Sequence, residues 1–428
     1  MDLLPRSSKS HPYRVMSRNF LKSCMSYWIS SQGIASAKSR LQYIANIRVI
    51  LVFLVVFHHV LVGYGAGSGK WYYNNPQAVS GLVGSFLTSL WLINHAFFMG
   101  FFFLLSSYFL PRALAKRGGK RYLAERFRRL GIPLVSYIIL INPILQYLAW
   151  RQKADFRGSI LEFVPVYLKY YSGLDVGVMW FLELLLIFSI LIVAWQWFAH
   201  RFQFHLPAWL DNPYDSSCQG KTLTNRKLIL FSLLMAVFTF ADRMLLYRNP
   251  PLELLGLPRG HIVQYIFLFV VGLRASSAEW FSQITVAQGR LWTSFACFIS
   301  TLFFCLVIFI GRNGIVLNPY SPESGWNAGA LLIFAVMESL LCVAMIITFL
   351  YWGRLLMDRG LPLLGQVQKS TFAIYVVHTP VVTALILLLT PVPLAAFPKF
   401  LVALFFALLG TVLIANLFRR TKLGAWVL

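Results

Sequence analysis

Long apolar stretches, each able to cross a lipid bilayer as a helix, are the feature that most constrains this chain. They lie near 44–64, 86–110, 131–149, 178–199, 228–246, 261–275, 291–310, 328–350, 371–390 and 399–418. Only 12% of the residues are charged, whereas a soluble domain carries about 25%. Because a transmembrane helix needs about 20 apolar residues, we predict an all-α fold: a polytopic membrane protein with about ten transmembrane helices.

The distribution of Lys and Arg predicts the topology. Residues 1–43 form a basic, serine-rich tail, and most of the 38 Lys and Arg fall in segments that an internal N-terminus would place inside. We therefore predict that both termini are cytoplasmic, with a membrane domain over 44–418 and a short tail over 419–428. The net charge of +24 then follows from topology, and we expect no nucleic-acid partner. An organellar targeting segment over 1–40 is the alternative for the tail.

The cysteine and histidine patterns do not predict a metal site. The chain has five cysteines, an odd number, and three of them lie inside apolar runs, which argues against a disulfide framework. The spacing of histidines and cysteines does not match that of zinc ligands. We therefore expect no metal and no permanently bound cofactor.

Two ionisable residues share one face of the first apolar run. Arg48 and His59 are eleven residues apart, which leaves them about 20° from alignment on a helix and about 16 Å apart along its axis. His58 points about 80° away from Arg48. A charged group at membrane depth costs about 2.5 to 3.5 kcal/mol, so each is a functional candidate. In the structural alternative, Arg48 anchors the helix at the interface and both histidines join neighbouring helices.

Other polar residues are predicted at a similar depth. Glu183 lies near the outer end of the fourth run, where a carboxylate beside His59 would orient the imidazole and increase its basicity. The alternative is a structural carboxylate bonded to a hydroxyl group. Glu338 lies in the middle of the eighth run without an evident partner. Further candidates are His95, Trp180, Tyr375 and His378.

The segment after the second run is the most basic part of the chain. Arg126, Arg128 and Arg129 directly precede the third run. Their guanidinium groups can bind phosphate through two parallel hydrogen bonds, which predicts a site for a phosphate-bearing substrate. Anionic lipid headgroups are the alternative ligand.

Five motifs occur in a fixed order between residue 44 and about residue 385. They are Arg48 with His59, the Phe-rich segment 101–109, Arg126-Phe-Arg128 before Pro133, Met179-Trp180-Phe181-Leu182, and Ile374-Tyr375-Val-Val-His378-Thr-Pro380. In this order they resemble the acyltransferase 3 family of membrane O-acyltransferases. Arg129-Leu-Gly-Ile-Pro133 and His95 are most similar to the branch that contains the succinyltransferases of periplasmic glucans.

The resemblance implies a membrane enzyme, in the inner (plasma) membrane of a bacterium, that carries out reactions such as O-acetylation. The enzyme would move an acyl group such as acetyl or succinyl from acyl-CoA to a hydroxyl group of a carbohydrate or glycan. It also implies that Arg48 and His59 are essential and that Arg126 and Arg128 form the arginine motif. Two positions depart from the family pattern, because Ala45 replaces an acidic residue and Ser107 replaces a glycine.

These placements predict a mechanism. Arg126, Arg128 and Arg129 would hold the CoA phosphates, and the pantetheine arm would extend along the face from Arg48 to His59. His59, oriented by Glu183 or another partner, would remove the proton from the acceptor hydroxyl. A covalent acyl-histidine relay is the alternative.

A transporter or flippase of a lipid-linked glycan is a hypothesis from a different class. In such a protein the buried Arg, His and Glu would form a proton relay. The sequence has no visible internal repeat of the kind found in many transporters, and its arginine cluster is suited to polyphosphate. Both features favour the enzyme.

Overall fold

All regular structure in the described residues is helical. The computed structural model describes residues 42–67, 71–171, 175–207, 210, 223–245, 260–313, 326–358 and 362–427. Most of the predicted basic tail, and with it the targeting alternative, lies outside these residues. The long helices are α2 (Gln42–Gly63), α3 (Gly81–Tyr108), α9 (Trp180–Arg201), α11 (Asn225–Leu245), α12 (Ile262–Ala278), α13 (Val286–Arg312), α14 (Ala328–Leu356), α15 (Pro362–Leu389) and α16 (Ala396–Arg420). The shorter ones are α4 (Leu110–Arg117), α5 (Gly119–Arg126), α6 (Ile132–Ser136), α7 (Asn142–Gln152), α8 (Ile160–Tyr171) and α17 (Lys422–Val427).

Nine helical stretches in the described part of the chain are long and apolar enough to cross a membrane. Two of them are composite, since Gly81–Arg117 joins α3 to α4 and Gly119–Gln152 contains α5, α6 and α7. The apolar helix α12 has 17 residues and coincides with the shortest of the predicted runs. The predicted all-α polytopic fold is therefore confirmed, and the protein is an integral multi-pass membrane protein.

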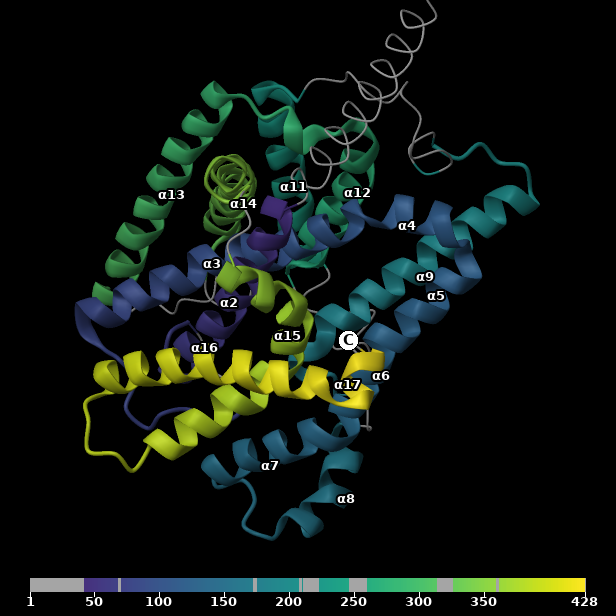
Figure 1. Cartoon of the computed structure of the whole chain (residues 1–428). Coiled ribbons are helices and arrows are strands. Elements are labelled where there is room, and N and C mark those ends of the chain that lie inside the picture. The colour runs from purple at the N-terminus through teal and green to yellow at the C-terminus, as the bar shows by residue number, and fades with distance from the viewer. Residues whose placement is uncertain are drawn as a thin grey trace, which may run out of the picture.

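Helix α2 lies at the centre of the bundle, where α3, α14, α15 and α16 pack around it (Figure 1). Apolar residues cover most of its circumference, which is the pattern of a fully enclosed helix. Near its first turn, the Asn46 amide donates to the Met357 carbonyl over 2.8 Å and accepts from the Gln368 amide over 2.5 Å. These bonds tie α2 to α14 and to α15. The rotation of α2, and hence the directions of Arg48 and His59, is fixed from several sides.

Helix α12 packs closely along α3. Gly272 of α12 makes this approach possible, because a Cβ atom at that position would overlap Ser107 Oγ and the Leu104 carbonyl oxygen. Small residues at a helix interface in a membrane let the two backbones come close together. Ser107 replaces the glycine of the family pattern, and the small residue on the facing helix supplies the missing space.

The third span is interrupted by two prolines. Pro133 and Pro143 have no backbone N–H and cannot complete the α-helical hydrogen bond to the residue four positions earlier. Pro133 follows the π-helical segment Phe127–Gly131, and Pro143 follows the π-helical segment Tyr137–Ile141. The wider turn of each segment accommodates the proline ring. Arg128 and Arg129 therefore lie in a π-helical turn, and α7 turns away from the direction of α5 (Figure 1).

The loop between α2 and α3 is bonded to the α7–α8 hairpin. The Tyr72 hydroxyl donates to Asn142 Oδ1 over 3.1 Å, and the Asn142 amide donates to Tyr167 of α8 over 3.1 Å. Burial raises the pKa of Tyr72 well above its usual value, so its hydroxyl remains a donor. The Gln152 side chain also bonds the backbone of Asn74 in both directions. The loop and the hairpin thus form one connected structure.

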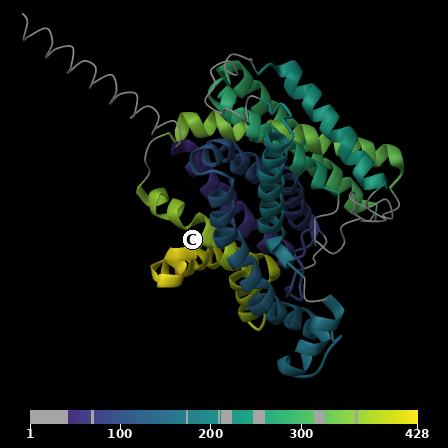
Figure 2. The same cartoon turned by 90° about the vertical axis from the view of Figure 1, so that its right-hand side faces the viewer.

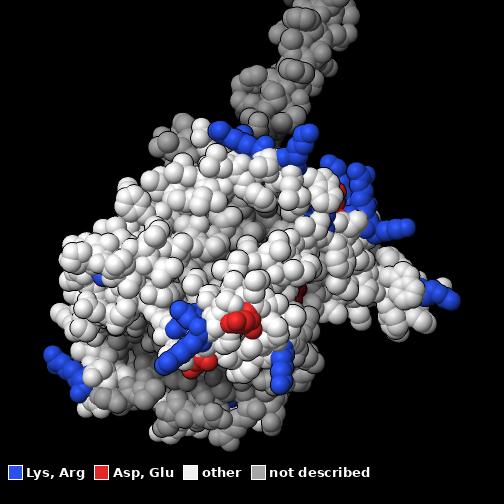
Figure 3. Space-filling view, turned by 90° about the horizontal axis from the view of Figure 1, so that it is seen from below, with Lys and Arg blue, Asp and Glu red and all other residues white. Residues whose placement is uncertain are grey.

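The bundle has two sides around its central helices. In Figure 2, α13 and α14 lie on one side of α2 and α3, and α16 and α17 lie on the other. Figure 3 shows the face at the bottom of Figure 1, where Lys, Arg, Asp and Glu occur in separate groups with a broad surface between them that carries none. The spans also expose large apolar side chains, such as Leu140 and Phe405. This surface is what a bilayer would cover.

Candidate active site

A cavity of about 410 Å³ is lined by residues of α2, α3 and α7 and by the start of α9. Its polar and aromatic lining residues are His58, His59, Trp71, Tyr72, Trp91, Gln146, Lys153 and Trp180. They come from α2, α3 and α9, from α7 and its C-cap residue, and from the loop that connects α2 to α3. The bonds between that loop and the hairpin therefore also shape the cavity wall.

His59 is held between two flat rings in the cavity wall. Its imidazole stacks on Trp71 with ring centres 4.4 Å apart and on His378 of α15 at 5.1 Å. Its buried Nδ1 has no hydrogen-bond partner among the described residues. His378 differs, since its own Nδ1 lies 2.5 Å from the Tyr375 carbonyl oxygen. His59 thus has a fixed ring position and an uncommitted nitrogen.

His58 also lines the cavity, but its surroundings are different. Its ring stacks on Phe98 with centres 4.9 Å apart and on His95 at 5.5 Å, and the Asn94 amide lies 3.3 Å from its Nδ1. The ring is 94% buried, since its exposed fraction is 6%. His58 and His59 thus have different ring partners, although both line the same cavity, and the choice of His59 over His58 stays a prediction.

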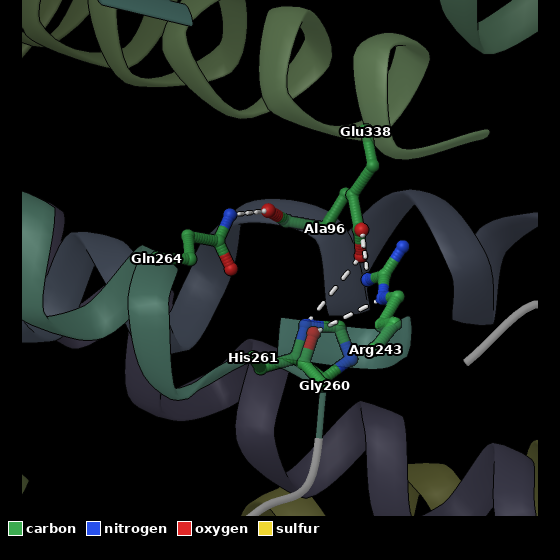
Figure 4. A network of polar contacts seen from close by, with 6 residues as sticks. All are labelled: Ala96, Arg243, Gly260, His261, Gln264 and Glu338. Carbon is green, nitrogen blue, oxygen red and sulfur yellow. Dashed lines mark hydrogen bonds and ion pairs between the residues drawn. The ribbon is translucent and has the colours of Figure 1, made fainter. Parts of the chain in front are cut away.

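Behind His58, a row of polar side chains continues away from the cavity. His95 lies 4.4 Å from His261 between ring centres, and His261 Nδ1 lies 3.5 Å from Glu338 Oε1. Arg243 of α11 makes an ion pair with Glu338 Oε2 over 2.5 Å, and Figure 4 shows Arg243 and His261 pointing toward the same carboxylate. The sequence singled out Glu338, but not its partners, which lie on other helices.

The ligand atoms of His95, His261 and Glu338 all lie within 4.8 Å of one another, close enough for a metal ion. Arg243 already neutralises the carboxylate at this point, and its positive charge opposes a cation. Removing the two charges from water costs free energy, and their pairing offsets that cost. We interpret the group as a buried ion pair that joins α11 to α14, with His261 beside it.

Glu183 is not joined to His59 by any hydrogen bond or ion pair within the described residues, and its buried Oε2 has no partner there. The predicted pair of imidazole and carboxylate is therefore absent from this arrangement, and a catalytic role of Glu183 stays a prediction. Trp180, predicted from the same helix, lines the cavity and stacks on Tyr265 with ring centres 5.2 Å apart. The Tyr375 hydroxyl donates to the Val178 carbonyl over 2.6 Å and fixes α15 against the start of α9.

Arg48 lies toward the opposite end of α2. Its guanidinium donates to the Leu105 carbonyl over 3.1 Å and lies 4.7 Å from the centre of the Phe109 ring. Arg126 is near enough for the two positive charges to repel each other. Arg126 itself donates from Nε to the Tyr122 hydroxyl over 2.8 Å. Guanidinium groups in this part of the bundle can bind an anionic group.

The structure separates the arginines that the sequence grouped together. Arg126 faces Tyr122 and the Arg48 region, whereas Arg128 lies over the Trp426 ring of α17 at 5.9 Å and lines a different cavity. Arg129 is exposed. The wider π-helical turn begins directly after Arg126 and directs the two side chains to different neighbours. Helix α17 lies in the segment predicted to be a short C-terminal tail.

A helical membrane bundle with a histidine-lined cavity near one side and interior arginines near the other has the features of a membrane-embedded transferase. Comparison with protein families gives a match to the acyltransferase 3 family, described as an acyltransferase domain, over residues 41–416. This match includes nearly the whole chain, so the protein belongs to that family and is a membrane O-acyltransferase. No curated protein and no solved structure matches the chain.

Proposed function

We propose that the protein transfers an acyl group from acyl-CoA to a hydroxyl group of a carbohydrate or glycan, with His59 as the general base. The observation that carries this proposal is the place of His59 in the wall of the cavity, with its ring held by stacking and its Nδ1 without a hydrogen-bond partner among the described residues. A general base must have a nitrogen that can accept a proton from a group within hydrogen-bond reach.

The composition of the cavity wall supports a carbohydrate acceptor. Trp71, Trp91 and Trp180 supply large aromatic surfaces, on which the apolar faces of sugar rings can stack. Gln146 and Lys153 supply donors that can orient hydroxyl groups. A cavity with apolar walls and a few polar groups is the usual form of a small-molecule site.

The donor is proposed to reach the site from the Arg48 end of α2. Arg126 and Arg48 would bind its phosphate groups, because two neighbouring guanidinium groups are favourable only with an anion between or beside them. The acyl thioester would then extend along α2 toward His59.

In the reaction, His59 takes the proton of the acceptor hydroxyl while the oxygen attacks the thioester carbonyl carbon. The new C–O bond forms, the C–S bond breaks, and the thiolate of CoA takes the proton back from the imidazolium. Atoms and charge balance without any further reactant. Direct transfer and transfer through an acyl-histidine use the same nitrogen and differ in the order of these steps.

The proposal is tested with purified protein in detergent, acyl-CoA and an oligosaccharide acceptor. Release of the free thiol, measured without any ion gradient, is expected from the wild type and from His205→Ala, which alters an exposed histidine far along the chain. His59→Ala should release none above background. Acyl-CoA that remains intact with the folded wild type and every acceptor class tried would contradict the proposal.

A further inference from the structure

A second cavity, of about 880 Å³, lies on a different part of the molecule. Its walls are formed by α5, α6 and the π-helical turn between them, by Leu186 of α9 and by Trp426 of α17. The side chains of Phe127, Val135 and Trp426 are each about half exposed, at 48%, 52% and 54%. The cavity is therefore an open groove at the surface of the described residues.

One end of this groove carries an uncompensated positive charge. Arg128 forms no ion pair within the described part of the chain, and its buried Nε has no hydrogen-bond partner there. The groove also contains Glu125, but that carboxylate is held by Arg117 at 2.6 Å and lies 4.0 Å from Arg121. A buried guanidinium nitrogen without a partner is costly unless an acceptor binds to it. An anionic acceptor at Arg128 would offset this cost.

The other end of the groove is apolar. Ile132, Leu134 and Val135 follow Arg128 on the same span, so this wall extends over about 10 Å along the helix axis. Leu186 lies on the facing helix. A tryptophan beside an arginine is typical of the level at which lipid headgroups meet the hydrocarbon. One charged end and one apolar wall fit an amphiphile better than a fully water-soluble anion.

We propose that this groove binds one anionic phospholipid from the leaflet on the side of α17. The headgroup phosphate accepts hydrogen bonds from Arg128, the glycerol region lies along Trp426, and an acyl chain packs against Phe127 and Val135. The acyl donor is a poorer fit because Arg126, the arginine proposed to bind it, bonds the buried Tyr122 hydroxyl, whereas Arg128 lies beside the half-exposed Trp426 in the open groove. Anionic headgroups are favoured over zwitterionic ones because Arg128 has no counter-charge.

The proposal is tested by titrating purified full-length protein in detergent with phosphatidylglycerol or phosphatidylcholine. The thermal midpoint is recorded, and bound lipids are counted by native mass spectrometry. For the wild type we expect tighter binding of phosphatidylglycerol and one lipid retained. Arg128→Gln should weaken that binding by about tenfold or more, the effect of losing one charge-assisted hydrogen bond. Lys120→Gln, which removes one exposed charge from the same basic stretch, should bind like the wild type.

A second variant tests the apolar wall. Val135→Trp fills the groove without a change in charge, so it should displace the retained lipid and leave the midpoint of the lipid-free protein unchanged. Equal affinity of the wild type for both lipids, or unchanged phosphatidylglycerol binding by Arg128→Gln, would overturn the proposal. A raised KM for acyl-CoA in Arg128→Gln with intact lipid preference would assign the arginine to the donor instead.

Discussion

Replacing each of the two adjacent histidines with Gln should separate catalysis from packing. His59 lines the cavity and its Nδ1 has no hydrogen-bond partner among the described residues, whereas the Nδ1 of His58 is engaged by Asn94 and its ring is packed against Phe98. A positioned general base contributes about 10²- to 10⁴-fold to a rate. His59→Gln should therefore raise the activation free energy by about 2.7 to 5.4 kcal/mol. In His58→Gln the new amide can still bond Asn94, so the loss should be below about tenfold.

The assay is thiol release from acyl-CoA at saturating acceptor, with kcat and KM obtained for both variants and normalised to folded protein. His59→Gln should lower kcat without a large change in KM for the donor, because a base acts in the chemical step and not in donor binding. Equal losses in the two variants would refute the argument from ring partners. Retention of more than about a tenth of the wild-type kcat by His59→Gln would exclude His59 as the base.

Three further predictions address the donor site, the buried ion pair and the topology. Arg126→Gln should raise the KM for acyl-CoA about tenfold to a hundredfold with kcat nearly unchanged, because one charge-assisted bond is lost in both ground and transition states; steady-state kinetics over a range of acyl-CoA concentrations test this. Glu338→Ala should destabilise the protein by about 3 to 5 kcal/mol by leaving Arg243 buried without its counter-charge, and Arg243→Met combined with Glu338→Leu should recover much of the thermal midpoint. A cysteine at Asp155 should react with an impermeant maleimide from outside intact cells and one at Gly118 only after lysis; the reverse pattern would invert the predicted topology.

The helices of this protein could be predicted because membrane spans are encoded locally. About 20 apolar residues in a row can satisfy their backbone in hydrocarbon only as a helix, so the runs in the sequence became the spans. Even the short sixth run corresponds to α12. The π-helical turns could not be predicted from the sequence, since Pro133 and Pro143 can be accommodated by a kink, a break or a wider turn.

The site was only partly predictable because its members come from helices distant in sequence. Helix phase put Arg48 and His59 on one face, but it could not place His378 against His59 or His261 beside Glu338. Those contacts depend on how α2, α14 and α15 rotate against one another. The separation of the arginine motif has the same origin, since local spacing says nothing about α17, which carries the ring above Arg128.

The contacts of the two stacked histidines, His378 and His59, indicate a structural role for the first and a catalytic role for the second. A carbonyl oxygen only accepts hydrogen bonds, so the contact with Tyr375 places the proton of neutral His378 on Nδ1. Its Nε2 is then an acceptor for the Thr379 hydroxyl at 3.4 Å, and both nitrogens are committed. His59 is held by stacking on Trp71 and His378, which fixes the ring plane without using either nitrogen. Stacking thus orients the His59 ring, which is the role that was predicted for Glu183. It leaves His59 free to take up and return a proton in each turnover.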